Sequence, residues 1–264
     1  MVPDCSFEGC SSCGVCGPDL GHNQVVPPPP VPALSHGGQP PSRRVSRLRC
    51  RFGKTGSLAL ISHLDTLRLL ERALRRSELP VSFSGGFHPL PRMQVALALP
   101  LGAEGRGEWM DLEFAQPVDP AAVRRRLQQE LPLEFKLESI VAVPVHGPSL
   151  SQELAAARWR IELLLQGEPL ASEAMTMAIS RVLEAEELPW HDRDKKGRPR
   201  QRDCRPYLRH LERMPSGEVA FEAGIDSLGR SLRPEHLQHW LSHASGEDLV
   251  LGRVSRQELM LRPC

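Results

Sequence analysis

Four cysteines near the N-terminus form the most reactive group in this sequence. Cys5, Cys10, Cys13 and Cys16 fall within twelve residues, with four, two and two residues between successive thiols. Iron–sulfur clusters are held by Cys-x4-Cys-x2-Cys and Cys-x2-Cys-x2-Cys strings, and this segment contains both spacings. Structural zinc usually draws its ligands from two separated pairs. The pattern predicts an iron–sulfur cluster; the alternatives are zinc, with His22 as a spare ligand, and a segment without metal.

The first cysteine interval is one residue longer than in Cys-x3-Cys-x2-Cys, the signature of radical SAM (S-adenosylmethionine) enzymes, and no barrel pattern follows. We therefore expect that this chain does not cleave S-adenosylmethionine by itself and that any cluster is auxiliary. Cys50, Cys204 and Cys264 are scattered. We interpret each as a buried or terminal residue, not as a metal ligand.

An arginine-rich helix is predicted over residues 62–77. Ser62 as N-cap and Asp65 three residues later indicate a capping box, and an apolar stripe runs from Leu64 to Leu74. Arginines spaced by three and four residues share one face, where their forked donors match phosphate oxygens. These arginines are Arg68, Arg72, Arg75 and Arg76. The alternative is a solvated face on which Glu71 pairs with Arg75.

The loop that follows, Ser-Gly-Gly-Phe-His-Pro at 84–89, is suited to holding a ligand. Its paired glycines let the backbone approach a ligand, and Phe87 can stack on a base. The alternative is a tight bend with Phe87 in the core. Triphosphate binding is not expected, because the loop lacks a P-loop motif. The RNA- or anion-binding residues predicted are Arg51, Lys54, His63, Arg68, Arg72, Arg75, Arg76, Gly86, Phe87 and His88.

Charge is unevenly distributed along a chain whose net charge is only +1. Residues 43–76 contain ten basic and two acidic residues, and residues 191–213 contain nine basic and four acidic ones. Clustered positive charge on a near-neutral protein is typical of anion or nucleic-acid binding. The basic segment 190–207 also holds Trp190 and Tyr207, which would suit single-stranded RNA; a charged loop is the equal alternative.

Residues 47–114 resemble the radical-SAM-linked protein family, whose members are encoded beside a radical SAM protein or fused to its C-terminus. The matching residues are Arg51, Phe52, Lys54, Ser62-His63-Leu64-Asp65, Arg72, Arg75-Arg76, Ser84, Gly86-Phe87, Pro89, Leu99-Pro100-Leu101-Gly102, Glu108 and Asp111. The family usually has Asn where this chain has His88, which keeps a polar group but not an amide. Residues 3–16 are similar to the C-terminal tail of the radical SAM partner, so the chain looks like the back end of a fusion or of a split gene.

The resemblance implies a radical SAM protein as partner and leaves the chemistry open. We expect an RNA-binding accessory module that presents tRNA or ribosomal RNA. One alternative is a metal-independent endoribonuclease of tandem ferredoxin-like architecture, with His63 or His88 as general base. Another is a protein–protein adaptor that docks on the radical SAM subunit.

Composition and element order predict an α+β fold. With 264 residues, 40% of them hydrophobic, the chain has room for two small domains. No apolar run could span a bilayer and no signal peptide is evident, so we expect a cytoplasmic protein without membrane contact. We predict a Cys-rich segment (1–24), a Pro-rich linker (25–44) and two tandem ferredoxin-like βαββαβ units with antiparallel sheets (45–148 and 149–264). Helices would cover one face of each sheet, leaving the other open.

Overall fold

The computed structural model describes residues 13, 40–193 and 196–262. The chain divides into two compact units, Met1–Gly38 and Gln39–Cys264, and the described fold belongs to the second unit. Apart from Cys13 and residues 40–44, the predicted Cys-rich segment and Pro-rich linker lie outside the described residues, as does Cys264. Within the described part, no helix combines the length and the apolar character that crossing a membrane requires.

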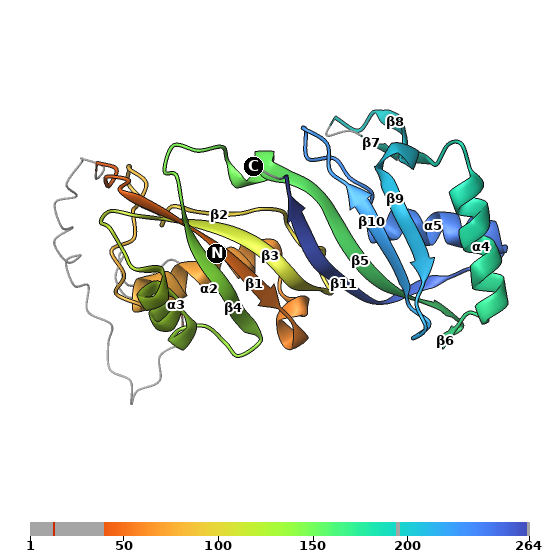
Figure 1. Ribbon diagram of the computed structural model, residues 1–264, viewed down its shortest axis with the longest axis horizontal. Coiled ribbons are helices and arrows are strands. Elements are labelled where there is room, and N and C mark those ends of the chain that lie inside the picture. The colour runs from red at the N-terminus through yellow and green to blue at the C-terminus, as the bar shows by residue number, and fades with distance from the viewer. Residues whose placement is uncertain (1–12, 14–39, 194–195, 263–264) are drawn as a thin grey trace. The chain divides into compact units, whose positions relative to one another are not determined.

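The fold is α+β, with four α-helices and one large, mostly antiparallel sheet of nine strands among the described residues (Figure 1). Its elements fall into an N-terminal and a C-terminal part. The N-terminal part contains β1 (Ser46–Lys54), η2 (Gly56–Leu60), α2 (His63–Arg76), β2 (Met93–Val95), β3 (Ala103–Phe114), α3 (Pro120–Gln129) and β4 (Phe135–Val143). The C-terminal part contains η3 (Leu150–Glu153), β5 (Leu154–Leu165), β6 (Glu168–Pro169), α4 (Ser172–Glu184), β7 (Pro189–Arg193), β8 (Pro199–Asp203), η4 (Arg205–Tyr207), β9 (Leu208–Arg213), β10 (Val219–Gly224), α5 (Pro234–Ser245) and β11 (Val250–Leu261).

The two parts share a single sheet, whereas the sequence suggested a sheet for each. The strand order is β4-β1-β3-β11-β5-β10-β9, with β2 on β3 and β6 on β5, while β7 and β8 form a separate hairpin. The join is a short parallel pairing of β3 with β11, in which Ala103 lies opposite Val254. The other pairings are antiparallel.

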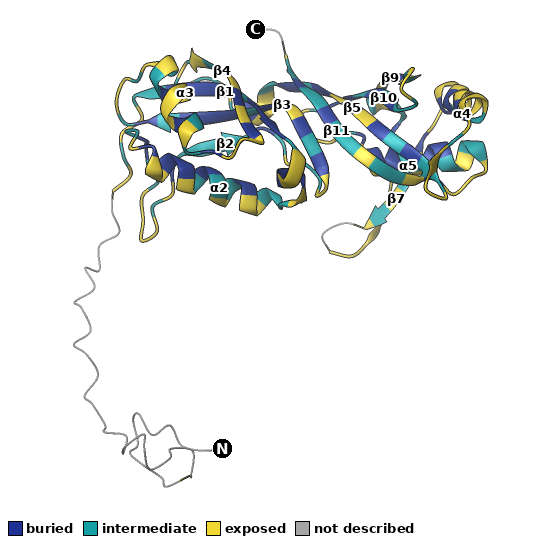
Figure 2. Cartoon of the chain, turned by 90° about the horizontal axis from the view of Figure 1, so that it is seen from below, coloured by how far each residue is buried: buried dark blue, intermediate teal, exposed yellow. Residues whose placement is uncertain are grey.

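Two hydrophobic clusters stabilise the sheet and its helices. In the N-terminal part, α2 and α3 pack on β1, β3 and β4, and Phe52 stacks on Phe135 with ring centroids 4.7 Å apart. In the C-terminal part, α4 and α5 pack on β5, β9, β10 and β11. Figure 2 shows the burial alternating along α2, with dark-blue positions between yellow ones. Leu64, expected in the apolar stripe, is 63% exposed, and Thr66 takes a buried position instead.

Local capping explains where the helices begin. Ser62 Oγ accepts a hydrogen bond from Asp65 N (3.2 Å), which confirms the predicted N-cap of α2. In α3, Asp119 accepts from Ala121 N and Ala122 N, and a proline occupies the first helical position. In α5, Pro234 occupies the first helical position, and Ser231 does not cap this helix, because its hydroxyl donates to Gly224 O (2.8 Å).

Candidate anion-binding surface

The exposed side of α2 carries the arginines that the sequence singled out. Arg68, Arg72, Arg75 and Arg76 are all exposed. Three of them are held by nearby carboxylates: Arg68 by Asp65 (3.0 Å), Arg75 by Glu71 (2.9 Å) and Arg76 by Glu130 (2.8 Å). Such surface pairs are weak and exchange readily with water. The guanidinium of Arg72 has no hydrogen-bond or ion-pair partner among the described residues, so it is the cation most available to a ligand.

The Gly-rich loop lies against the C-terminal half of this helix. Arg75 donates to Pro89 O (3.1 Å), and its guanidinium carbon lies 5.2 Å from the centre of the Phe83 ring. Ser84 closes the loop, since its hydroxyl accepts from Leu90 N (3.0 Å). Gly86 has a φ of +105°, a conformation that L side chains rarely adopt. The structure therefore ties the loop to the arginine face of α2.

Phe87 projects into solvent at the tip of this loop. Its side chain is 74% exposed, so the alternative in which Phe87 packs in the core is wrong. The neighbouring residues of the loop, including His88, are exposed as well. His63, by contrast, begins α2 and lies at the other end of the helix from the loop. Since fourteen residues of helix span about 20 Å, His63 and His88 do not share one site.

Two residues predicted for this surface do not belong to it. Lys54 is 3% exposed, and its ammonium donates to Ile61 O (3.2 Å) and Thr66 Oγ1 (3.4 Å). Burial lowers the pKa of Lys54, and the negative charge of Glu108 partly offsets this effect. Arg51 does not belong to the α2 surface for a different reason. It alternates with the core residues of β1, so its side chain lies on the sheet face away from α2.

Arg51 and the other arginines of β1 have partners that neutralise them. Arg51 pairs with Glu138 (3.1 Å) and Glu258 (3.7 Å) and lies over Trp109. The three arginines of β1, at 47, 49 and 51, are thus paired with acids that are distant in the sequence, so their charge does not indicate a free cationic surface.

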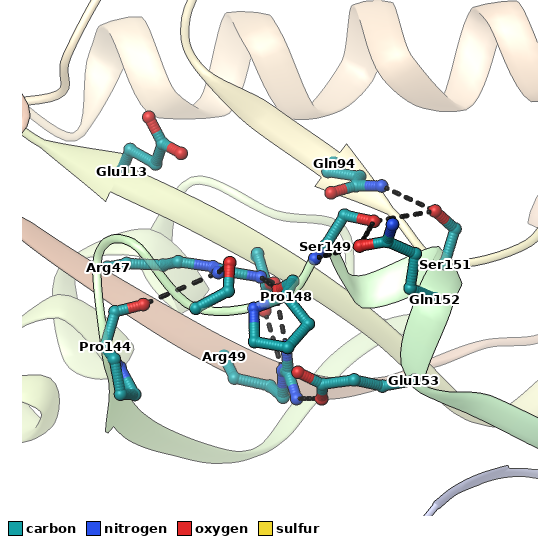
Figure 3. A network of polar contacts seen from close by, with 12 residues as sticks. Arg47, Arg49, Gln94, Glu113, Pro144, Pro148, Ser149, Ser151, Gln152 and Glu153 are labelled. Carbon is teal, nitrogen blue, oxygen red and sulfur yellow. Dashed lines mark hydrogen bonds and ion pairs between the residues drawn. The ribbon is translucent and has the colours of Figure 1, made fainter.

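The face of the N-terminal part opposite its helices is covered over Arg47 and Arg49. Arg47 and Arg49 both donate to Asp111, at Nε distances of 3.0 and 2.9 Å. Figure 3 shows both arginines reaching the connection that crosses this face, where Arg47 donates to Pro148 O (2.9 Å) and Arg49 to Glu153. Both guanidinium groups are buried, so this face offers them no contact with a nucleic acid.

A second group of arginines was only partly found from the sequence: Arg200 and Arg202 lie in the basic segment 190–207, whereas Arg230 and Arg233 were missed. Arg230 and Arg233 stand on the loop before α5, and Arg200 and Arg202 stand on β8. They line one cleft beside the first turn of α5. A signal for the site was available, because Pro234 directly after Arg233 marks a helix start, where anions are favoured.

The described cysteines show no metal site. Cys50 and Cys204 are buried, as expected, and burial raises the pKa of each thiol. No group of three or more His, Cys, Asp or Glu side chains within the described ranges is arranged to hold a metal ion. The predicted ligands Cys5, Cys10 and Cys16 lie outside those ranges.

Comparison with known proteins places this fold in a family. A family model described as "Uncharacterized protein conserved in bacteria (DUF2344)" matches residues 47–242. The chain belongs to this family. The DUF2344 match takes in the arginine face of α2, the Gly-rich loop and the four arginines of the second cleft, and it ends within α5. No curated protein matches the chain.

Solved structures were also compared with this DUF2344 chain. One similar chain comes from the "Crystal Structure of a Cbf5-Nop10-Gar1 Complex", with 14% sequence identity and a TM-score of 0.43. The alignment covers 80% of this chain and 48% of that one, so this chain spans about half the length of the structure it matches. At this TM-score the likeness supports no statement about function.

Proposed function

We propose that this chain is an RNA-binding accessory module that presents tRNA or ribosomal RNA to a radical SAM enzyme. The observation that carries the proposal is the exposed Phe87 side chain, which the Arg75 contact with the same loop places beside the arginine face of α2. Aromatic rings that stack on bases, combined with cations that contact phosphates, are the usual means of holding single-stranded nucleic acid. The radical SAM partner rests on the sequence resemblance.

The strand order supports the finer architecture that we propose. Each part has one helix after its first strand and another before its last, and its strands follow the spatial order fourth, first, third, second: β4-β1-β3 with β2, and β11-β5-β10-β9. This is the βαββαβ order of a ferredoxin-like unit. In the assembled complex, the thiols of the N-terminal segment would hold an iron–sulfur cluster or zinc close to the partner's active site.

RNA binding tests this proposal directly. Filter binding or fluorescence anisotropy with total tRNA and ribosomal RNA fragments, across a salt series, gives the affinity and the number of phosphates engaged. Phe87→Ala is expected to weaken binding about 5- to 150-fold, since stacking of one base contributes roughly 1–3 kcal/mol. Leu90→Ala, which shortens an exposed apolar side chain next to the same loop without removing a ring, is the matched control.

The arginine face has its own test. Arg72→Ala is expected to reduce the slope of log K against log salt by about 0.7–1, the contribution of one phosphate contact. Arg126→Ala, which removes an exposed arginine on the neighbouring helix α3, is expected to leave the slope unchanged. Unaltered binding in Phe87→Ala and an unaltered slope in Arg72→Ala would refute the assignment. Gel analysis of the bound RNA addresses the endoribonuclease alternative, which requires cut RNA.

One observation favours the adaptor alternative as a second candidate. Leu60, Leu64 and Leu101 are 74%, 63% and 71% exposed. They lie near the start of α2, where Gly102 N donates to Ala59 O (2.9 Å) and so brings two of these segments together. Contiguous exposed apolar side chains are typical of protein interaction sites. If the radical SAM subunit docks here, Leu64→Ser combined with Leu101→Ser will abolish co-purification without changing RNA affinity.

A further inference from the structure

A cleft of about 460 Å³ lies where the N-terminal and C-terminal parts meet, away from the α2 surface. One wall is the segment 97–100, which leads into β3. The other walls are the hairpin strand β8 and the loop that enters α5. Its lining contains five arginines and a single carboxylate, Glu235. The arginines are Arg200, Arg202, Arg230, Arg233 and Arg256.

Only some of these arginines serve the fold. Arg256 is fully buried and bound to Glu108. Arg230 pairs with Asp226 (2.7 Å). Arg233 is exposed at the N-cap of α5, where its backbone N–H donates to His236 Nδ1 (3.3 Å), and its guanidinium has no acceptor among the described residues. An anion bound here is stabilised both by the unpaired guanidinium and by the positive end of the helix dipole.

The cleft also contains buried donors without acceptors. Trp159 is 5% exposed and lines the cleft, yet its Nε1–H has no hydrogen-bond partner. Arg202, which donates to Asp192 through Nη2 (2.6 Å), leaves its buried Nε–H unpaired. Elsewhere, Trp109 and Trp240 both donate to backbone carbonyls, at 2.8 and 3.2 Å. Since buried N–H groups nearly always find acceptors, two such orphans in one cleft indicate ligand oxygens.

The walls of the cleft can also contact an apolar part of a ligand. Leu97, Leu99 and Pro100 on one wall, together with Leu232, add apolar side chains to the lining of the cleft. Its volume is within the range of small-molecule sites, roughly 300–1,000 Å³. His236, in the first turn of α5, has its pKa lowered to about 4, mainly by burial and also by the positive charges of Arg202 and Arg233. These two guanidinium groups add positive charge to the lining of the cleft.

We propose that this cleft binds a nucleotide, with its phosphate against Arg233 and the N-terminus of α5 and its base against the apolar wall at Leu99 and Pro100. The nucleotide is either free or the 5′-terminal unit of an RNA. This site is separate from the α2 surface and does not depend on the proposed RNA presentation.

Isothermal titration calorimetry of the full chain tests the site with four probes: adenosine 5′-monophosphate, adenosine, inorganic phosphate and a 5′-phosphorylated oligoribonucleotide. The monophosphate is expected to bind at least about tenfold more tightly than either adenosine or phosphate, because a hydrogen bond to a charged group contributes about 1.5–3 kcal/mol. Arg233→Ala is expected to weaken the monophosphate about tenfold or more. Arg126→Ala and Phe87→Ala are expected to bind it as the unaltered chain does.

The indole N–H signals in a proton–nitrogen NMR spectrum provide a second readout. The signal that is missing from the spectrum of Trp159→Phe belongs to Trp159. In the unaltered chain this signal is expected to shift when the monophosphate is added. Competition between oligoribonucleotide and monophosphate identifies RNA as a source, and binding of the monophosphate alone identifies free nucleotide. Equal affinity for monophosphate and adenosine, equal affinity for monophosphate and phosphate, or unchanged binding in Arg233→Ala overturns the proposal. If Phe87→Ala loses RNA binding but keeps nucleotide binding, the cleft binds the nucleotide independently of the α2 surface.

Discussion

Arg256 is the residue whose replacement should most disturb the join between the two parts. Its side chain, like that of Glu108, is 1% exposed, and the two groups form a bidentate pair with an Nε–Oε1 distance of 2.8 Å. The guanidinium also donates to Leu97 O (2.7 Å) and Ala98 O (3.3 Å). Arg256→Met leaves a buried carboxylate without its partner, together with two unpaired carbonyls.

Removing one partner of a buried ion pair typically costs about 3–5 kcal/mol. For a chain of this size, that loss corresponds to a fall in Tm of roughly 6–20 °C. Replacing both partners, as in Glu108→Leu with Arg256→Met, should restore most of the loss, because no uncompensated charge remains buried. The double-mutant cycle is expected to give a coupling of about 2 kcal/mol or more.

Urea denaturation followed by far-UV circular dichroism measures these free energies. Arg253→Met is the matched control, because it removes an arginine from the same strand whose side chain is 84% exposed and pairs only loosely with Glu162 (3.6 Å). We expect it to change the free energy of unfolding by less than about 1 kcal/mol. An Arg256→Met chain within about 1 kcal/mol of the unaltered one, or a double mutant that loses the sum of the two single losses, would show that the pair does not hold the join.

Three further predictions follow from buried positions. A Cβ at Gly107 would lie 2.7 Å from the backbone of β11, so Gly107→Ala should lower the free energy of unfolding by about 1–3 kcal/mol, whereas Gly53→Ala, with its nearest atom at 3.5 Å, should be tolerated in the same urea assay. Burial lowers the pKa of His236 from 6.5 to about 4. The stability that this group contributes above pH 6.5 should therefore be lost as the pH falls toward 4, by at most about 3 kcal/mol. In thermal melts, His236→Asn should remove this pH dependence. Cys50 and Cys204, whose thiol pKa values are raised by burial, should resist iodoacetamide until the protein unfolds; rapid alkylation of either one, seen by peptide mass spectrometry, would contradict the fold.

Features encoded over a few residues were predictable from the sequence. The apolar periodicity after Ser62 predicted a helix over 62–77, and α2 spans His63–Arg76. The N-cap predicted at Ser62 is also present, since its hydroxyl accepts from Asp65 N. Caps and alternation act through neighbours in the chain, so the sequence displays them directly. Pro234, which occupies the first position of α5, is a local signal of the same kind.

Features that depend on distant partners were not predictable. Counting charge along the chain made Arg47 and Arg49 part of a basic patch, but their shared partner Asp111 lies more than sixty residues away. Whether Phe87 lies in the core or in solvent depends on how its loop is tied to α2, which periodicity does not report. The parallel contact between β3 and β11 leaves no local signal, and for that reason the single sheet was missed.

The position of β11 has a consequence for biosynthesis. This strand lies in the middle of the sheet, between β3 and β5, yet every other strand of the sheet precedes it in the chain. During translation, β3 and β5 therefore each keep one unpaired edge until β11 leaves the ribosome. A ribosome that stalls before residue 250 releases two half-sheets, each with an open edge that invites pairing with another chain. Chaperones and proteases should accordingly recognise truncated chains most readily when these chains lack β11.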